Sequence, residues 1–457
     1  MNNLLPTDYQ SFIHTSRYAR WLKEDKRRES WSETVSRYML NVVEDKVDKD
    51  TENKLFDAIL GLEVMPSMRA MMTAGPAFNR DNTAGYNCSY LAVDDPKSFD
   101  EAMFILLCGT GVGFSVERQF ISKLPDVPKL FESETTVVVK DSKEGWAKAF
   151  RQVLALLWAG EIPRWDVSRV RPAGAKLETF GGRASGPAPL IDLFNFSVTI
   201  FKNASGRNLS SIECHDLMCK VGEVVVVGGV RRSAMISLSN LSDDRMRHAK
   251  SGNWWENAAH RALANNSVSY SEKPDSMAFM REWTALMESG SGERGIFNRE
   301  ASIKQAAKNG RRESCYEFGT NPCSEIILRP NQFCNLTEVV IRATDGLEDL
   351  TRKVRLATVL GTIQSTFTNF PYLRKVWHTN TAAERLLGVS LTGIMDNKLM
   401  TLENKGLSDT LEHLKNVAVS TNAEWADRLG IPHSTAITCV KPSGTVSQLV
   451  DSASGIH

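Results

Sequence analysis

The first 84 residues place apolar side chains at the spacing of amphipathic helices. Ser30 and Glu33 have the spacing of a capping box, in which each side chain bonds the backbone N–H of the other at the start of a helix. The apolar positions that follow fall on one helical face: Val35, Met39, Val42 and Val43. The pattern predicts a helical N-terminal region over residues 1–84.

From residue 85 the pattern changes to short apolar runs separated by amphipathic stretches. This alternation is typical of an α/β domain with largely parallel strands. Four runs have the length and composition of strands: Tyr90–Val93, Val137–Val139, Val224–Val227 and Met235–Leu238. A clear amphipathic helix begins near Asp141. Because no repeat, low-complexity tract or flexible linker follows, residues 85–457 are expected to form one α/β domain.

Composition and charge exclude several classes of partner. Lys and Arg number 55 against 54 for Asp and Glu, so a net charge of +1 gives no global field to attract nucleic acid or a membrane. The basic run Arg17–Arg28 is interrupted by Glu24 and Asp25, and we interpret it as a solvated helix that buries Tyr18 and Trp21. The N-terminus has no apolar signal core, and the longest apolar stretches are too short or too Gly-broken to span a bilayer. No nucleic-acid or membrane partner is expected.

The eight cysteines are too sparse for a disulfide scaffold and fit a reduced, cytoplasmic compartment. Cys214 and Cys219 lie in a helical pattern, so buried structural thiols are favoured over zinc ligands. No metal site is expected.

Four Gly-rich segments resemble turns that contact phosphate through backbone amides. They are Gly109–Gly113, Phe180–Gly186, Gly228–Ser233 and Lys441–Thr445. Arg183, Arg231 and Arg232 lie in two of them and could neutralise the phosphate charge. None is a Walker loop, and Gly109–Gly113 does not complete a dinucleotide fingerprint. Each alone is explained by ordinary turn chemistry, whereas four together favour a phosphorylated ligand.

The most reactive group of residues is the stretch Asn321-Pro322-Cys323-Ser324-Glu325, followed by Cys334. The proline and the preceding Gly319 favour a loop, on which an amide, a thiol and a carboxylate can converge on one small ligand. Such a group can supply sulfur chemistry, accept a proton and hold a hydroxyl. A structural cysteine beside a turn is the alternative reading of this stretch alone.

Taken in order, these motifs resemble the catalytic subunit of ribonucleotide reductases, most closely the adenosylcobalamin-dependent (class II) ribonucleoside-triphosphate reductases. The segments that carry the resemblance span nearly the whole chain: Tyr18–Trp21, Pro66–Arg69, Asn87-Cys88, Gly111–Ser115, Arg171-Pro172, Gly181–Pro187, Val230–Ser233, Asn265–Ser267, Asn321–Glu325, Cys334–Leu336 and Pro442–Thr445.

The resemblance implies a ten-stranded α/β barrel around a central finger loop, preceded by the helical N-terminal region. It also implies a radical mechanism in which a Cys323 thiyl abstracts the ribose 3′ hydrogen. Glu325 would take the 3′-hydroxyl proton as general base, and Asn321 would hydrogen-bond the ribose hydroxyls. Cys88 and Cys334 would supply two electrons and end as a disulfide, which a thioredoxin-like protein would reduce.

The resemblance further implies that the substrate phosphates lie on Ser443, Gly444 and Thr445, with Ser67 near the substrate. A deoxynucleotide effector would act through the specificity region that contains Arg183, Arg231, Arg232 and Ser233. The radical source expected from the resemblance is adenosylcobalamin. The alternatives are a class I-type subunit that takes its radical from a metal-containing, ferritin-like partner, and a non-catalytic nucleotide-binding remnant. Whether the substrate is a ribonucleoside diphosphate or triphosphate stays open.

The chain departs from the family in two places. It stops at His457, where family members continue, so the last barrel strands are expected to be missing and to be supplied by a C-terminal fragment or replaced by self-association. The segment from Cys88 to Trp146 is also shorter than in the monomeric class II enzymes.

Overall fold

The computed structural model describes residues 4–175, 183–227 and 234–455, and these form two compact units. The first unit comprises Met1–Cys88, Asn309–Arg312 and Gln332–His457. The second comprises Ser89–Lys308 and Glu313–Asn331. The C-terminal segment therefore clusters with the N-terminal region, whereas the sequence pattern had placed the single boundary at residue 85.

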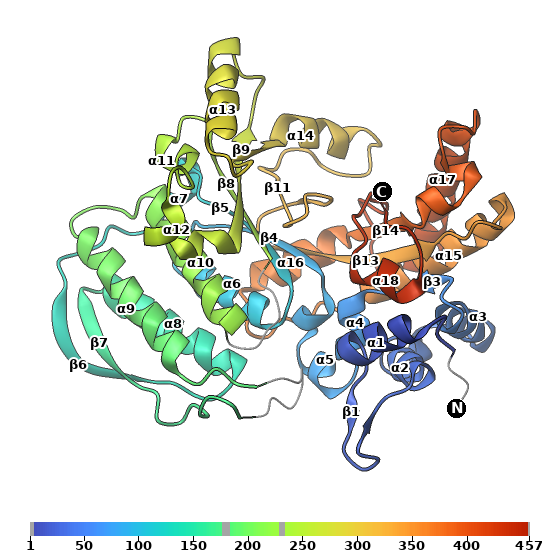
Figure 1. The fold of residues 1–457 in the computed structure, drawn as a ribbon, viewed down its shortest axis with the longest axis horizontal. Helices are drawn as coiled ribbons and strands as arrows, with labels where there is room; N and C mark the ends of the chain where they lie inside the picture. The colour runs from blue at the N-terminus through green and yellow to red at the C-terminus, as the bar shows by residue number, and fades with distance from the viewer. Residues whose placement is uncertain (1–3, 176–182, 228–233, 456–457) are drawn as a thin grey trace. The chain divides into compact units, whose positions relative to one another are not determined.

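The first unit is mostly helical and surrounds a short sheet (Figure 1). Strand β13 pairs in parallel with β14 and antiparallel with β3, and helix α15 packs against β13 and β14. The helices and strands of this unit are α1 (Asp8–Arg17), β1 (Trp21–Leu22), β2 (Arg27–Arg28), α2 (Trp31–Tyr38), η1 (Met39–Val43), η2 (Glu44–Lys46), α3 (Lys49–Leu60), β3 (Val64–Met65), α4 (Met68–Thr73), α5 (Pro76–Arg80), η3 (Asn82–Gly85), β13 (Gln332–Val340), α15 (Leu347–Gln364), α16 (Lys375–Glu384), β14 (Leu387–Thr392), η5 (Ile394–Asp396), η6 (Lys398–Met400), α17 (Leu407–Leu429) and α18 (Thr445–Val450).

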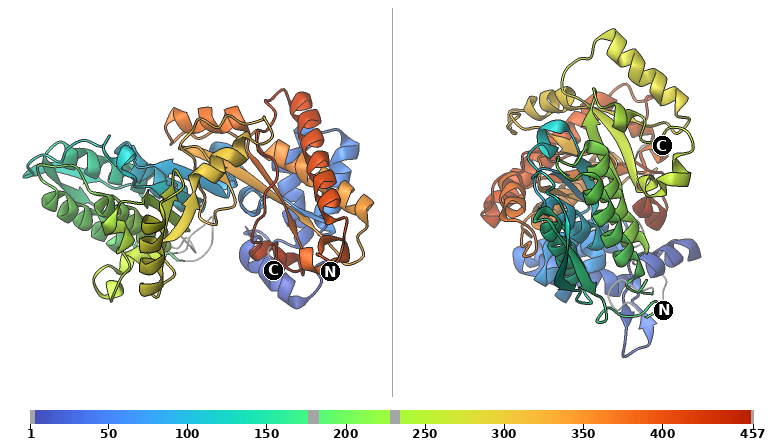
Figure 2. Two further views of the ribbon diagram at one scale, coloured as in Figure 1. Left: turned by 90° about the horizontal axis from the view of Figure 1, so that it is seen from above. Right: turned by 90° about the vertical axis from the view of Figure 1, so that its left-hand side faces the viewer.

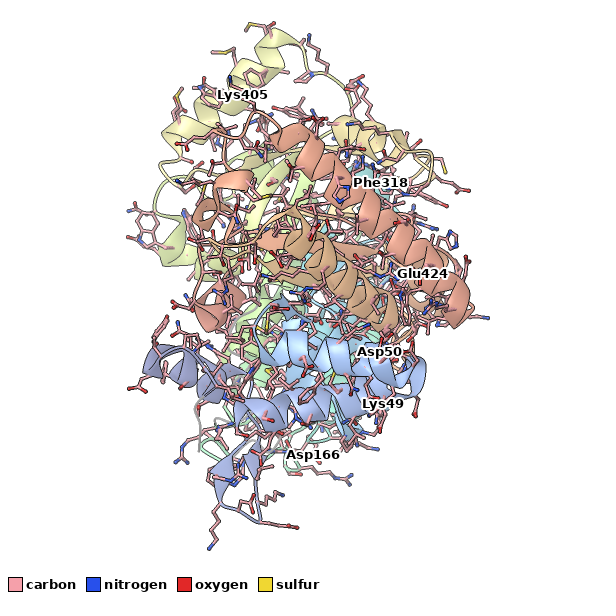
Figure 3. All side chains as sticks on the ribbon, turned by 90° about the vertical axis from the view of Figure 1, so that its right-hand side faces the viewer. Lys49, Asp50, Asp166, Phe318, Lys405 and Glu424 are labelled. Carbon is pink, nitrogen blue, oxygen red and sulfur yellow. The ribbon has the colours of Figure 1, made fainter. Side chains whose placement is uncertain are left out.

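The N-terminal region is helical, as its periodicity predicted. The capping box forms, with the Glu33 N–H donating to Ser30 Oγ at 3.3 Å and the Ser30 N–H donating to Glu33 Oε2 at 2.7 Å. The four apolar positions after the box are all buried. Charged residues of α3 and α17, among them Asp50 and Glu424, lie on the outside of the first unit (Figure 3).

The helix expected over Arg17–Arg28 is wrong. Helix α1 ends at Arg17, and β1 and β2 form a small antiparallel hairpin. Lys26 takes a left-handed backbone conformation with φ 52° in the turn, where a helix could not continue. Tyr18 is buried as expected, but Trp21 is 54% exposed because it lies on this hairpin.

The second unit is an α/β layer whose strands follow the order β10-β9-β8-β5-β4. The pairs β5/β8, β8/β9 and β9/β10 are parallel. The helices and strands of this unit are β4 (Cys88–Ala92), α6 (Lys97–Leu107), β5 (Gly111–Ser115), α7 (Arg118–Ile121), β6 (Phe131–Val138), α8 (Lys143–Trp158), β7 (Glu161–Asp166), α9 (Ala188–Asn203), α10 (Ser211–Val227), β8 (Met235–Asn240), α11 (Asp244–Arg247), α12 (Trp254–Asn257), η4 (Ala259–Leu263), β9 (Ala264–Tyr270), α13 (Ser276–Glu288), β10 (Gly295–Asn298), α14 (Arg299–Ala307), β11 (Gly319–Thr320) and β12 (Ile327–Leu328).

Most elements predicted for this region are present, with one exception. The runs at Tyr90, Val137 and Met235 lie in β4, β6 and β8, and the helix expected near Asp141 is α8. The run Val224–Val227 is not a strand, because it forms the last turn of α10. Helix α10 is buried along most of its length, and a short apolar run cannot distinguish a buried helix from a strand by periodicity.

Two features stand apart from the central layer of the second unit. Strands β6 and β7 form a parallel ribbon that packs against α8, which in turn contacts α9 (Figures 1 and 2). Helix α13 projects from the strands β8 and β9 in both figures. Its Glu282 is buried against Arg294, whereas Met277, Met280 and Met287 are 51–69% exposed. Among the described residues, no helix is long and apolar enough to cross a membrane.

Candidate active site

The residues Asn321, Cys323 and Glu325 lie at the tip of one β-hairpin in the second unit. Strands β11 and β12 form its stem, with Gly319 opposite Leu328 and Thr320 opposite Ile327. Within the tip, the Ser324 N–H donates to the Asn321 carbonyl oxygen at 2.9 Å, and Ser324 has a φ of 63°. This turn leaves the side chain of Cys323 exposed at the apex.

Asn321 organises the tip through its side-chain amide. Its Nδ2 donates to Glu325 Oε2 at 2.6 Å, and its Oδ1 accepts the Ile326 N–H at 3.0 Å. Asn321 is 2% exposed, whereas Glu325 is partly exposed, so a buried amide holds a half-buried carboxylate beside the thiol-bearing turn. The loop predicted from sequence is confirmed as a structured hairpin.

Glycines of β5 allow the hairpin to lie directly on the sheet. A Cβ atom at Gly113 would overlap the carbonyl oxygen of Thr320, and one at Gly111 would lie 3.0 Å from Pro322 Cγ. On the hairpin itself, a Cβ at Gly319 would overlap the ring of Tyr90. The phosphate-binding turn suggested for Gly109–Gly113 is therefore a different feature. Gly111 and Gly113 lie in a strand, and their missing side chains make room for the hairpin.

Cys88 and Cys334 are both buried and both belong to the first unit. The ring of Tyr86 lies 5.3 Å from the ring of Phe333, which places the two short segments that carry these cysteines side by side. Burial raises the pKa of Tyr86, and Cys334 adds to this effect. Cys334 Sγ donates to the Asn335 carbonyl oxygen at 3.3 Å, so its thiol is held in a defined position.

The segment Ser443–Thr445 leads into α18 and is held by a buried carboxylate. Glu338 on β13 accepts one bond from Lys441 Nζ and one from Ser443 Oγ, both at 2.6 Å. The Ser443 hydroxyl is therefore already engaged, since its Oγ also accepts a bond from the Ser447 N–H at 3.1 Å. The first backbone amides of a helix have no carbonyl partner within that helix, so those of Gly444 and Thr445 suit an anion.

Ser67 belongs to a second polar group in the first unit. Its Oγ donates to the Gly85 carbonyl oxygen at 3.0 Å and contacts Asn87 Oδ1 at 2.5 Å. Its N–H donates to Gln364 Oε1 at 3.0 Å, and Gln364 Nε2 donates to Asn335 Oδ1 at 2.9 Å. This chain of bonds connects Ser67 to the residue that follows Cys334.

Of the residues assigned to the effector region, only Arg183 lies within the described residues. It is exposed, and its Nη1 donates to the Gly174 carbonyl oxygen at 2.9 Å. Arg231, Arg232 and Ser233 lie outside the described residues. Within the described part of the chain, no group of three or more His, Cys, Asp or Glu side chains could hold a metal ion.

Sequence reasoning missed the residues that support these sites from a distance. Glu338 accepts hydrogen bonds from the segment before α18. Tyr90 and Gly113 pack directly against the stem of the hairpin. Glu338 and Tyr90 carry no local motif, and Gly113 was assigned to a Gly-rich turn, because each acts through a partner far away in the sequence. A signal was present only for Gly113, because glycine inside a strand indicates a close backbone approach.

The family described as "B12-dependent ribonucleotide reductase, insertion domain" matches residues 123–200. The match includes β6, α8, β7 and most of α9, where the sequence pattern had indicated no separate domain. The chain thus contains a region that matches this insertion domain.

Curated relatives extend the similarity over the chain. The adenosylcobalamin-dependent ribonucleoside-triphosphate reductase of Lacticaseibacillus paracasei is 28% identical over 96% of this chain and 71% of its own length. The enzyme of the same name from Lactobacillus leichmannii is 29% identical over 96% of this chain and 72% of its own length.

Solved structures agree with these relatives. A B12-dependent (class II) ribonucleotide reductase superposes with a TM-score of 0.84 at 25% identity, covering 98% of this chain and 74% of that one. The alpha subunit of the class Id ribonucleotide reductase of Actinobacillus ureae gives a TM-score of 0.58 at 12% identity, over 99% of this chain and 75% of that one, which indicates a related fold alone. The chain is therefore a homologue of the B12-dependent, class II ribonucleotide reductases and has their α/β fold, as the order of its motifs predicted.

Proposed function

We propose that this chain reduces ribonucleotides to 2′-deoxyribonucleotides through a thiyl radical on Cys323. The observation that carries the proposal is the hairpin tip, where Asn321 binds Glu325 at 2.6 Å beside an exposed thiol. The relatives that match 96% of the chain are named for this reaction with triphosphates. Together these observations favour a catalytic chain over a non-catalytic nucleotide-binding remnant.

The roles of the residues follow from their chemistry. The Cys323 thiyl takes the 3′ hydrogen of the ribose and returns it at the end of the cycle. Glu325 accepts the 3′-hydroxyl proton, and Asn321 holds that carboxylate in place. Cys88 and Cys334 together give up two hydrogens. One leaves with the 2′-hydroxyl as water, the other replaces that hydroxyl on C2′, and the two sulfurs join as a disulfide.

We propose adenosylcobalamin as the radical source. When bound, this group supplies a one-electron oxidation by cleavage of its cobalt–carbon bond. The exposed position of Cys323 at the hairpin apex fits such a bulky group, because a buried thiol could not be approached. A metal-containing partner subunit is less well supported, since the class Id subunit shares only 12% identity with this chain.

We assign the binding of nucleotides to two further places. The substrate phosphates are proposed to lie on the backbone of Ser443, Gly444 and Thr445, with Ser67 near the ribose. A deoxynucleotide effector is proposed to act through the region of Arg183 and Arg231–Ser233. A thioredoxin-like protein would reduce the disulfide after each turnover, and the need for free thiols favours the cytoplasm.

We also propose that another polypeptide covers part of the second unit. Met277, Met280 and Met287 on α13 are more than half exposed, and Ile296 on the outer strand β10 is 47% exposed. Exposed apolar side chains on a helix and on the strand at the edge of a sheet are typical of an interaction site. A C-terminal fragment or a second copy would cover it. Measuring the mass in solution of the wild type and of a Met280→Lys variant, alone and with a C-terminal fragment, tests this. A wild type that stays monomeric and binds no fragment would contradict it.

The test of the function is a reductase assay. Residues 1–457 are incubated with adenosylcobalamin, a dithiol and each ribonucleoside di- or triphosphate, with and without a C-terminal fragment, and deoxynucleotides are measured by chromatography. The Cys323→Ser variant should bind nucleotide as the wild type does and form no product, because an alcohol O–H bond is too strong for this hydrogen transfer. Substantial product from this variant would exclude the proposed radical site.

A further inference from the structure

A buried ion pair lies at the base of the hairpin in the second unit. Arg299, the first residue of α14, is 2% exposed, and Glu117 is fully buried. Arg299 Nη1 donates to Glu117 Oε1 at 2.8 Å, and Nη2 donates to Oε2 at 2.5 Å. Two parallel bonds between a guanidinium and a carboxylate fix their relative orientation as well as their distance.

The carboxylate of Glu117 is itself held by two other side chains. Ser115 Oγ donates to Oε2 at 2.7 Å, and Gln119 Nε2 donates to Oε1 at 3.1 Å. Gln119 is anchored in turn, because its Oε1 accepts a bond from Asn240 Nδ2 at 3.1 Å. With four donors on one carboxylate, Glu117 is a rigid support for Arg299 at the end of β5.

The third nitrogen of the Arg299 guanidinium reaches the hairpin, while Nη1 also donates to Ser271 Oγ at 3.4 Å. Arg299 Nε donates to the carbonyl oxygen of Phe318 at 2.7 Å. Phe318, labelled in Figure 3, is fully buried and immediately precedes Gly319, the first residue of the stem. One guanidinium therefore connects the end of β5 to the chain at the point where the hairpin begins.

We propose that Arg299, oriented by Glu117, is a positioning residue for the Cys323 hairpin. The inference rests on the proposed function, since it assigns Arg299 to the placement of the radical thiol. A lysine at this position would keep the positive charge but could not bind the carboxylate with two nitrogens and Phe318 with a third. The geometry of the guanidinium, and not its charge alone, is what the hairpin requires.

The experiment compares Arg299→Lys with Arg294→Lys as a matched control. Arg294 is also buried in the second unit and binds Glu282 with two bonds, at 2.9 and 2.7 Å, but its other partners are Ser239, Asn240 and Leu241. Hydrogen exchange of peptides that cover residues 319–328 reports on the hairpin without any cofactor. The kcat and KM of the loaded enzyme report on the chemistry.

In Arg299→Lys we expect hairpin exchange to rise about 10-fold and kcat to fall at least about 10-fold, with KM unchanged. In Arg294→Lys the hairpin exchange and kcat should stay near wild type. Wild-type hairpin exchange and kcat in a folded Arg299→Lys would overturn the proposal, as would an equal loss in the control. If Arg299→Lys does not fold, the isosteric Glu117→Gln carries the same test. Because the exchange measurement needs no activity, it distinguishes failure of this inference from failure of the proposed function.

Discussion

Replacing Gly113 by alanine tests whether the close contact between β5 and the hairpin sets the position of the thiol. The new methyl group would occupy the space of the Thr320 carbonyl oxygen, which belongs to the backbone and cannot rotate away. Ordinary contact between these atoms requires the strand or the hairpin to move by roughly 1.5 Å. A displacement of 1 Å at a reacting group can reduce the rate by about 100-fold. We expect a loss of that size in kcat.

The assay measures deoxynucleotide formation under saturating substrate, together with KM and the unfolding temperature. Overpacking should cost about 1–3 kcal/mol of stability, so the variant should still fold. Gly346→Ala is the control, because its nearest neighbour would be Asp349 Oδ2 at 3.7 Å and its φ is −90°. A folded Gly113→Ala enzyme with kcat within about 3-fold of wild type would refute the reasoning. The position of the hairpin on β5 would then not control the rate.

Three further predictions concern other residues. Glu325→Gln should lower kcat by about 100-fold or more with little change in KM, because the amide cannot accept the 3′-hydroxyl proton, and a wild-type rate would remove Glu325 from the mechanism. After one turnover without reductant, peptide mass spectrometry should find a Cys88–Cys334 disulfide while Cys323 can still be alkylated, and a disulfide that includes Cys323 would contradict the assignment. Burial lowers the pKa of His14 from 6.5 to about 4, so below pH 6.5 the unfolded chain binds a proton that the folded chain does not. The free energy of unfolding should therefore fall between pH 6.5 and 4, by roughly 1.4 kcal/mol per pKa unit. Urea unfolding of wild type and His14→Gln between pH 7 and 5 checks this prediction, and equal declines in the two proteins would contradict it.

The sequence predicted features that depend on neighbours in the chain. The capping box at Ser30 and the loop around Cys323 follow from spacing and residue type, and both are present. The strand expected at Val224–Val227 failed because local hydrophobicity does not reveal whether a helix or a strand is buried. The bond between the Ser443 hydroxyl and Glu338 could not be predicted, because it joins residues that are far apart in the sequence.

The contacts that support the hairpin also join residues far apart in the sequence, so they leave no local signal around Cys323. Nothing near Cys323 indicates that Gly113 must lack a side chain, or that Arg299 reaches the carbonyl oxygen of Phe318. Both requirements arise from packing between segments that the chain brings together only when it folds. Resemblance to a family predicts which residues react, whereas the residues that position them could be found only from the structure.

The contact between β5 and the hairpin also has a consequence for the order of folding. Gly113 and Thr320 are about 200 positions apart in the sequence, so their contact closes a long loop and is expected to form late. During synthesis, β5 leaves the ribosome well before the hairpin that it will support. Strand β5 therefore stays without its hairpin until nearly all of the second unit has been made. In the growing chain, the glycine face of β5 is left uncovered while about 200 further residues are made, and the hairpin can dock on it as soon as it emerges.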